Sequence, residues 1–231
     1  MSKSLTSFTA VSTFSECPFK YYLAYVAGEK PLFKPAYDFG KTLHDVIKNY
    51  YSLLPSAVTP KEVRMYLTQA AKKAGIDPSS RIVYLENFAR FEEQRLSWNV
   101  NPKPIAVEKE FVREPLHGIV DVLFVDARGE KVVVDWKTSL KSDSQMWEAR
   151  KLQGNIYMYL TGARRAIFYG LRDGNFEEFT YDEGFLKEKL ERFFEGLKKE
   201  VYERRRGEHC LTCEYNIQCS AREWGFEVLE L

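Results

Sequence analysis

The most informative pattern of apolar and polar residues lies at 118–137, where two short apolar runs flank a turn at 126–130. Gly129 can supply the positive φ angle that a three-residue hairpin loop needs at its last position. The two runs are therefore predicted to pair as antiparallel strands. If residues 126 and 130 close the turn, Asp121 stands directly opposite Asp135, and directly opposed residues share a face of the sheet.

Side chains alternate between the two faces of a strand, so Lys137 shares the face of Asp121 and Asp135. Apolar residues occupy both faces of the hairpin. They are Ile119, Leu123 and Val133 on the charged face, and Val120, Val122, Phe124, Val132, Val134 and Trp136 on the other. This pattern predicts a hairpin that is covered on both sides, with its three charges half buried.

Two carboxylates and one ammonium on such a face admit two interpretations. A buried ion pair of Lys137 with one aspartate leaves the second carboxylate unexplained, and neighbouring carboxylates repel each other in a low dielectric. A divalent cation removes this conflict, because Mg²⁺ and Mn²⁺ prefer carboxylate oxygens and water. The sequence therefore favours a hard-metal site over a simple ion pair.

The rest of the chain alternates between helical and strand periodicities. Helices are predicted at 7–27 with a break before Pro18, and at 38–54, 61–74, 80–98, 144–161 and 184–206. Strands are predicted at 105–113, 164–171 and 176–181. The last helix would end in three arginines at 204–206, where a solvated helix end and a phosphate-contacting patch are equally good interpretations.

Four residues outside the hairpin are candidates for the same site. His44 lies at the edge of an apolar helical stripe, where a structural role is the usual one. Glu108 and Glu110 share one face of a predicted strand, and a solvated edge is the simpler interpretation, although Glu108 is a candidate third carboxylate. Gln153 and Tyr157 stand four apart on a helix and can therefore face the hairpin together.

The chain has 231 residues, which suits one sizeable domain, and a formal net charge of +1 from 34 Lys and Arg against 33 Asp and Glu. This balance neither favours nor excludes nucleic acid, so any basic surface must be local. No apolar run is long enough to span a membrane, and the N-terminus lacks the apolar core of a signal peptide. We therefore expect a soluble, cytoplasmic protein without structural disulfides.

The cysteines form a second candidate site. Cys210, Cys213 and Cys219 follow the spacing C-x2-C-x5-C, and Cys17 is available as a fourth ligand. Such a set in an intracellular chain indicates a soft metal, and both zinc and an iron-sulfur cluster accept four thiolates. A zinc site of three cysteines and His209 is the competing arrangement. Four protein ligands would leave no open position, which favours a structural role.

Taken in order, these residues resemble the RecB-like branch of the PD-(D/E)XK nuclease superfamily. The resemblance is closest to the CRISPR-associated RecB-like exonucleases with an iron-sulfur cluster, and it covers nearly the whole chain. It rests on His44, Asp121, Asp135-Trp136-Lys137, Gln153-x3-Tyr157, and one cysteine before three.

The resemblance implies a fold and roles for these residues. The fold would be α/β, with a central mixed sheet of about four or five strands flanked by helices. His44, Asp121, Asp135 and the Trp136 carbonyl would hold Mg²⁺ or Mn²⁺, and Lys137 would be the catalytic lysine. Gln153 and Tyr157 would position the DNA or the lysine. The four cysteines Cys17, Cys210, Cys213 and Cys219 would hold a 4Fe-4S cluster.

The resemblance further implies one nuclease domain over 1–231, with a helical lobe at about 28–100 and a catalytic sheet at about 102–183. Residues 1–27 and 184–231 would come together around the cluster. The activity would be trimming of single-stranded DNA ends during CRISPR spacer acquisition, with the spacer-integrating proteins as partners and a role in antiviral defence. A repair, recombination or viral nuclease, a DNA-end-binding module with a vestigial site, and a zinc-stapled scaffold are the alternatives.

Overall fold

The structure is a computed structural model that describes residues 5–31, 38–97, 100–140 and 144–223. The chain divides into two compact units. The first consists of Met1–Leu5 and Tyr37–Asp182, and the second of Thr6–Ala36 and Glu183–Leu231. Each unit is described by itself below.

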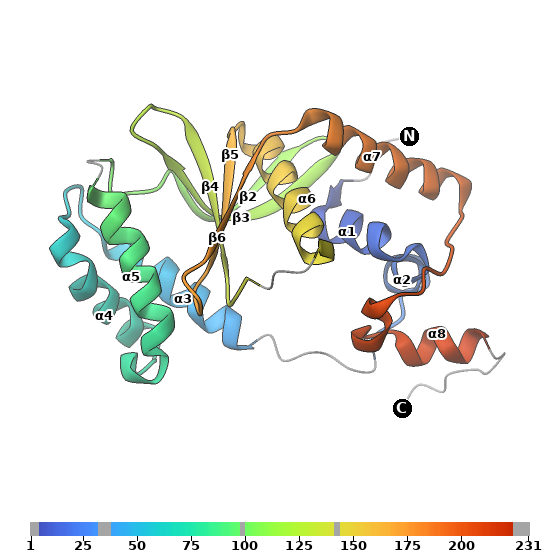
Figure 1. The fold of residues 1–231 in the computed structure, drawn as a ribbon, viewed down its shortest axis with the longest axis horizontal. Coiled ribbons are helices and arrows are strands. Elements are labelled where there is room, and N and C mark those ends of the chain that lie inside the picture. The colour runs from blue at the N-terminus through green and yellow to red at the C-terminus, as the bar shows by residue number, and fades with distance from the viewer. Residues whose placement is uncertain (1–4, 32–37, 98–99, 141–143, 224–231) are drawn as a thin grey trace. The chain divides into compact units, whose positions relative to one another are not determined.

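A mixed sheet forms the centre of the first unit (Figure 1). The strands that this unit contributes are β2 (Ala106–Arg113), β3 (Leu116–Val125), β4 (Lys131–Lys137), β5 (Arg165–Gly170) and β6 (Phe176–Thr180). Neighbouring strands are antiparallel except β4 and β5, which are parallel and are connected through helix α6 (Ser144–Thr161). The predicted mixed α/β fold is thus confirmed, and so are the predicted strands to within one or two residues.

One face of this sheet packs against three helices, which Figure 1 shows on the side opposite α6. These are α3 (Asp38–Leu53), α4 (Val63–Lys73) and α5 (Ile82–Ser97), with the 3-10 turns η2 (Pro60–Glu62) and η3 (Pro78–Arg81) before α4 and α5. Trp136 of β4 is 2% exposed and meets the rings of Phe88 and Phe91 edge-on, with centroids 5.1 and 4.9 Å away. Such aromatic packing stabilises strand β4 on this face of the sheet.

Helix α6 covers the other face at unusually close range. A Cβ atom added at Gly154 would lie 3.2 Å from the Ala166 Cβ, and one added at Gly118 of β3 would lie 3.2 Å from the Leu160 side chain. These two glycines therefore let the helix approach the strands, and this approach brings the helix side chains onto the hairpin. Covering on both faces, predicted for the hairpin from its apolar pattern, is confirmed for Leu123 and Val133, which are 1% and 0% exposed.

Ile119 is an exception to that prediction, because it is 58% exposed. It pairs with Glu110 of β2, at a point where β3 has passed beyond its pairing with β4, which ends at Val122 and Val134. Alternation along a strand does not reveal where a neighbouring strand stops. The prediction that Ile119 is buried was therefore wrong.

The second unit joins the N-terminal and C-terminal parts of the chain. Its elements are β1 (Thr6–Ser7), α1 (Phe8–Glu16), α2 (Pro18–Tyr21), the π-helical turn η1 (Tyr22–Val26), α7 (Glu183–Lys199), the 3-10 turn η4 (Glu208–Thr212) and α8 (Asn216–Glu223). The rings of Phe14, Tyr21 and Phe193 meet edge-on with centroids 5.4 to 5.6 Å apart, which packs α1 and α2 against α7. The predicted break before Pro18 is confirmed.

Helix α7 ends at Lys199, earlier than predicted, and Glu200 follows with a positive φ of 53°. The three arginines therefore do not cap a helix, and this prediction was wrong. The Arg204 guanidinium lies 4.1 Å over the Phe19 ring, Arg205 Nη1 donates to the Ser15 carbonyl at 2.5 Å, and Arg206 pairs with Glu223. The prediction extended the helix too far because Val201 continues the helical spacing of apolar residues in α7. In the structure Val201 lies beyond the helix and is 46% exposed.

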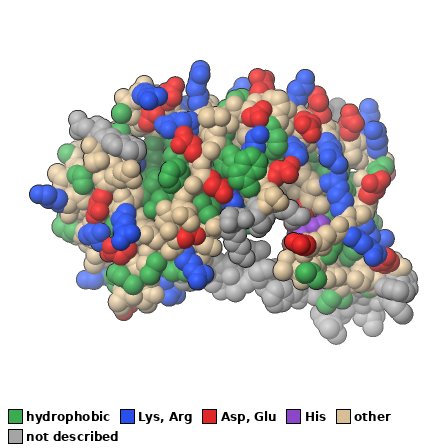
Figure 2. All heavy atoms as spheres, in the orientation of Figure 1, with side chains coloured by type: hydrophobic (Ala, Val, Ile, Leu, Met, Phe, Trp, Pro, Cys, Tyr) green, Lys and Arg blue, Asp and Glu red, His purple; other side chains and the backbone are tan. Residues whose placement is uncertain are grey.

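Surface properties agree with the balanced composition. On the face drawn in Figure 2, Lys and Arg side chains are interspersed with Asp and Glu rather than gathered in one field. None of the described helices combines the length and the apolar character required to cross a membrane.

Candidate active site

The β3–β4 hairpin pairs in the predicted register, with Val122 opposite Val134 and Leu123 opposite Val133. Extending this register by one residue brings Asp121 opposite Asp135. At that point the Asp121 side chain replaces a backbone partner, because its Oδ2 accepts a hydrogen bond from the Trp136 N–H at 2.9 Å. The Asp121 carboxylate is therefore held beside the Asp135–Lys137 segment.

Asp135, Lys137 and Gln153 form a closed ring of polar contacts. Lys137 Nζ lies 2.7 Å from Asp135 Oδ2 and donates to Gln153 Oε1 at 3.1 Å. Gln153 Nε2 in turn donates to Asp135 Oδ1 at 2.9 Å and to the Tyr157 hydroxyl at 3.0 Å. The amide thus fixes both ends of the acid–lysine pair, with its oxygen on the cation and its nitrogen on the anion.

His44 approaches the same segment from α3. Its Nε2 lies 3.1 Å from the Trp136 carbonyl, and since a carbonyl only accepts, Nε2 is the donor. Its Nδ1 lies 3.8 Å from both Asp121 Oδ2 and Glu108 Oε1. One ring nitrogen and two carboxylate oxygens thus lie close together, and groups of these types can bind a cation.

Glu108 has an unusual backbone conformation for a strand residue. Its φ is +42°, and the ladder pairs on either side, Val107 with Val122 and Lys109 with Val120, bracket Glu108 and Asp121. A non-glycine residue in this region costs on the order of 1 to 3 kcal/mol and tends to persist at functional sites. The carboxylate also pairs with Lys48, whose Nζ lies 3.1 Å from Oε2.

Electrostatics within the site favour the neutral forms of two groups. Burial and the neighbouring Asp135 carboxylate raise the pKa of Asp121 to about 7, against the opposing influence of His44, the Trp136 N–H and Lys137. Burial, Asp135 and Asp121 likewise raise the pKa of the Tyr157 hydroxyl, which therefore stays protonated. The raised pKa of Asp121 shows that a second negative charge is unfavourable at this site, and a bound cation would offset that cost.

These groups fit a hard metal ion by chemistry. His44, Asp121 and Asp135 offer imidazole nitrogen and carboxylate oxygen, and the Asp135 side chain is almost fully buried, with 2% of the residue exposed. Within the described parts of the chain, no three His, Cys, Asp or Glu side chains already stand in a metal-holding arrangement. Ion binding would therefore require the side chains to draw closer.

The sequence profile of the PD-(D/E)XK nuclease superfamily matches residues 6–220. The chain belongs to the PD-(D/E)XK nuclease superfamily. Its Asp135-Trp136-Lys137 segment has the form of the (D/E)-x-K element that names the superfamily. Membership implies a nuclease that acts on DNA with a divalent metal such as Mg²⁺ or Mn²⁺.

Twenty-four chains of solved structures are similar to this chain, and two of them, both of low identity, are described here. SSO0001 is 18% identical with a TM-score of 0.39, and the match covers 79% of this nuclease and 96% of that chain. A candidate exonuclease from Eubacterium rectale is 16% identical with a TM-score of 0.48, over 99% of this chain and 90% of that one. A comparison with curated protein sequences finds no match.

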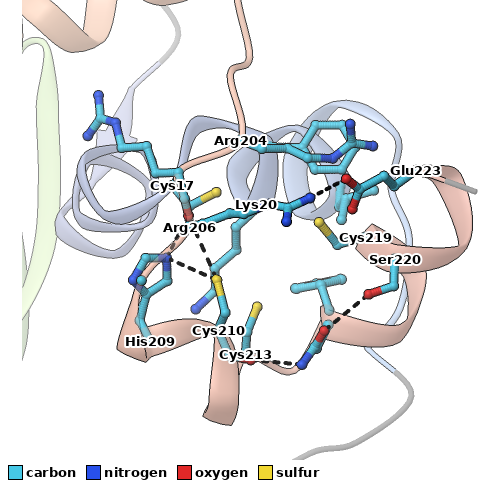
Figure 3. Close-up of a pocket in the computed structure, with 16 residues that line it drawn as sticks. Cys17, Lys20, Arg204, Arg206, His209, Cys210, Cys213, Cys219, Ser220 and Glu223 are labelled. Atoms are coloured by element: carbon cyan, nitrogen blue, oxygen red, sulfur yellow. Dashed lines mark hydrogen bonds and ion pairs between the residues drawn. The ribbon is translucent and has the colours of Figure 1, made fainter.

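The four cysteines line one cavity of about 230 Å³ in the second unit, and Figure 3 shows their sulfur atoms turned toward this space. None of the four is in a disulfide. Burial raises the pKa of the Cys213 thiol, so a bound metal would be needed to favour its thiolate. His209, the competing zinc ligand, has its Nε2 3.0 Å from the Arg205 carbonyl and 3.7 Å from Cys210 Sγ.

The sequence analysis missed two lysines at these sites. Lys48 follows His44 by one helical turn, so its spacing alone was a signal for a cation beside the hairpin. Lys20 lines the cysteine cavity and pairs with Glu16 at 2.9 Å and Glu214 at 3.1 Å. Nothing in the local sequence links Lys20 to Glu214, because the pairing depends on the two termini meeting.

Proposed function

We propose that this chain is a RecB-like, Mg²⁺- or Mn²⁺-dependent nuclease that trims single-stranded DNA ends. The observation that carries the proposal is the ring of Asp135, Lys137 and Gln153 beside Asp121 and His44. An isolated ion pair would need neither the second acid nor the imidazole. Five groups of the types expected for phosphodiester cleavage converge at one end of the hairpin.

In this proposal His44, Asp121, Asp135 and the Trp136 carbonyl hold the metal ion. When bound, the ion lowers the pKa of a water molecule and stabilises the charge that develops at phosphorus. Lys137 orients the attacking water or neutralises developing negative charge. Its ammonium is suited to this because Gln153 holds it at 3.1 Å while its side chain remains 33% exposed.

Gln153 and Tyr157 then act as positioning residues. Gln153 keeps the Asp135 carboxylate and the Lys137 ammonium in register, and its own place is set by the Tyr157 hydroxyl. Gln153 and Tyr157 both project from α6. The close approach of this helix to the sheet at Gly118 and Gly154 therefore supports their role.

The finer assignment rests on the resemblance to CRISPR-associated RecB-like exonucleases. On this basis we propose that the chain trims precursor DNA for CRISPR spacer acquisition during antiviral defence, with the spacer-integrating proteins as partners. We propose a cytoplasmic location for this activity. A repair, recombination or viral nuclease would have the same site, and a DNA-end-binding module would have the same fold without cleavage. Additional endonuclease activity is compatible with the site.

For Cys17, Cys210, Cys213 and Cys219 we propose a structural 4Fe-4S cluster. A single zinc ion binds four sulfurs at about 2.3 Å, which requires them to converge on one point. In the second unit they surround a cavity of about 230 Å³. A cavity of this size between the four thiols supports a 4Fe-4S cluster rather than a single zinc ion.

Cleavage of labelled single-stranded DNA with and without Mn²⁺ tests the activity. We expect Asp121→Ala and Lys137→Ala to abolish cleavage, while the matched variants Asp45→Ala and Lys61→Ala, which change exposed residues elsewhere in the first unit, cleave normally. Full metal-dependent cleavage by either site variant would sink the assignment. DNA binding without any cleavage by the wild type would favour the end-binding alternative.

Anaerobic purification with metal analysis tests the cluster. We expect a brown protein with iron and sulfide, and loss of the colour in Cys213→Ser but not in Ser220→Ala, which lines the same cavity without a thiol. A colourless protein containing one zinc would contradict the proposal and support the zinc-stapled alternative.

A further inference from the structure

The departure of Glu108 from strand geometry is confined to one residue. Its φ of +42° lies between regular ladder pairs, Val107 with Val122 and Lys109 with Val120. A glutamate gains nothing from this conformation by itself, so the surrounding contacts must offset its cost. Those contacts are made by the carboxylate, which reaches helix α3.

The two oxygens of this carboxylate face different groups. Oε1 lies 3.8 Å from His44 Nδ1, and Oε2 lies 3.1 Å from Lys48 Nζ. His44 and Lys48 are one turn apart on the same side of α3. Glu108 is thus placed between the candidate metal site and a lysine whose side chain is 57% exposed.

We propose that Lys48 contacts a backbone phosphate of the DNA strand and that Glu108 controls its availability. In the metal-free protein Glu108 holds Lys48. Once the site beside His44 is loaded, the Glu108 carboxylate turns toward it, and Lys48 is released to the DNA. This inference rests on the proposed function and deepens it, because it couples metal loading to substrate binding.

The charges and the exposure of Glu108 and Lys48 support a switch of Glu108 from Lys48 to the metal site. An ion pair with an exposed lysine is weak in water, so a modest change at the site can break it. A nearby divalent ion attracts a carboxylate more strongly than one ammonium does, and Glu108, with 26% of its side chain exposed, has the partial freedom to respond. A lysine is well suited to a phosphate contact as a compact point charge.

The salt dependence of DNA binding measures the number of phosphate contacts. Each contact to a single strand contributes about −0.7 to the slope of log K against log salt concentration. The experiment titrates a short, labelled phosphorothioate single strand with full-length protein over a salt series, in EDTA and in Mg²⁺. The phosphorothioate prevents cleavage from interfering with the binding measurement.

Four proteins are compared: the wild type, Lys48→Met, Glu108→Gln and the control Lys109→Met, which removes an exposed lysine beside Glu108 on the same strand. In Mg²⁺ we expect the wild-type slope to be steeper than that of Lys48→Met by about 0.7, and affinity to differ roughly 3- to 10-fold. In EDTA these two proteins should be alike. Glu108→Gln should already have the steeper slope in EDTA, because its Lys48 is not held.

Equal slopes for the wild type and Lys48→Met in Mg²⁺ would overturn the proposal. An equal loss in Lys109→Met would overturn it too, since the effect would then be one of general charge. If the wild type cleaves DNA with Mn²⁺ but shows no effect of Lys48, only this inference fails. If it neither cleaves nor binds DNA with metal, the proposed function fails with it.

Discussion

The Asp121 side chain, which is 15% exposed, lies beside the Asp135 carboxylate, whose negative charge makes ionisation of Asp121 less favourable. Burial and the Asp135 carboxylate raise the pKa of Asp121 from 3.8 to about 7. Between about pH 4 and pH 7, the Asp121 carboxyl therefore stays largely protonated in the folded, metal-free protein, whereas in the unfolded chain it is ionised.

The first prediction is that metal-free stability falls as pH rises. A raised pKa contributes stability that is fully present below 3.8 and is lost as pH rises through about 7. We expect the free energy of unfolding in EDTA to decrease across this window by at most about 1.4 kcal/mol per pH unit, the equivalent of one proton. Urea denaturation at a series of pH values measures it.

Asp121→Asn should remove this dependence, whereas Asp45→Asn, an exposed aspartate on α3, should retain it. With Mn²⁺ present the trend should reverse, because the ion needs the ionised carboxylate and its affinity rises with pH up to about 7. Identical pH profiles for Asp121→Asn and the wild type would show that this carboxyl does not titrate as stated.

The second prediction concerns Gln153. Gln153→Leu keeps most of the side-chain volume but removes the contacts with Asp135, Lys137 and Tyr157. We expect single-turnover cleavage to slow by roughly 10- to 100-fold, as is typical when a partner of a metal or catalytic group is lost. Saturating Mn²⁺ should not restore the rate, because Lys137 stays misplaced.

Gln94→Leu makes the same chemical change at an exposed position of α5 and should cleave at the wild-type rate. Unaltered cleavage by Gln153→Leu would mean that Lys137 finds its position without the amide.

The third prediction separates two glycines. A methyl group at Gly118 would lie 3.2 Å from Leu160 Cδ1 and 3.3 Å from Tyr157 Cε1, so Gly118→Ala should force α6 away from β3. We expect a loss of about 1 to 3 kcal/mol in stability and slower cleavage, because Tyr157 moves. Thermal or chemical unfolding together with a cleavage assay measures both effects.

Gly40→Ala serves as the matched control on α3. Its new methyl group would meet only Thr138 Oγ1 at 3.5 Å, an ordinary contact, and alanine favours the helix by about 0.5 to 1 kcal/mol. A gain at Gly40 with a loss at Gly118 is expected. Similar effects at both positions would show that backbone freedom, rather than helix approach, decides the outcome.

Much of the hairpin could be predicted because its information is local. The turn chemistry at Gly129, whose φ is +80°, fixes the register, and the register places Asp121 near Asp135. Alternation then adds Lys137 to the same face. None of these steps requires knowledge of distant residues.

Features that depend on tertiary packing were not predictable in this way. The exposure of Ile119 depends on where β4 ends, and the end of α7 at Lys199 depends on how residues 200–206 pack within the second unit. The backbone of Glu108 departs from its ladder to reach His44 and Lys48, contacts that alternation cannot reveal. The catalytic and metal-binding roles given to the site residues stay predictions. So does the division of the chain into a helical lobe, a catalytic sheet and a cluster-binding part.

The last prediction concerns Lys20 at the cysteine cavity. Although burial alone would lower it, the pKa of Lys20 is raised by its contacts with Glu16 and Glu214, so it stays charged. Cluster potentials depend on nearby charge. Lys20→Met should lower the reduction potential of the proposed cluster by on the order of 60 mV, a tenfold change for a one-electron couple. Redox titration followed by electron paramagnetic resonance measures it, with the exposed Lys30→Met as control. An unchanged potential in Lys20→Met, or an equal shift in Lys30→Met, would contradict a specific effect of Lys20.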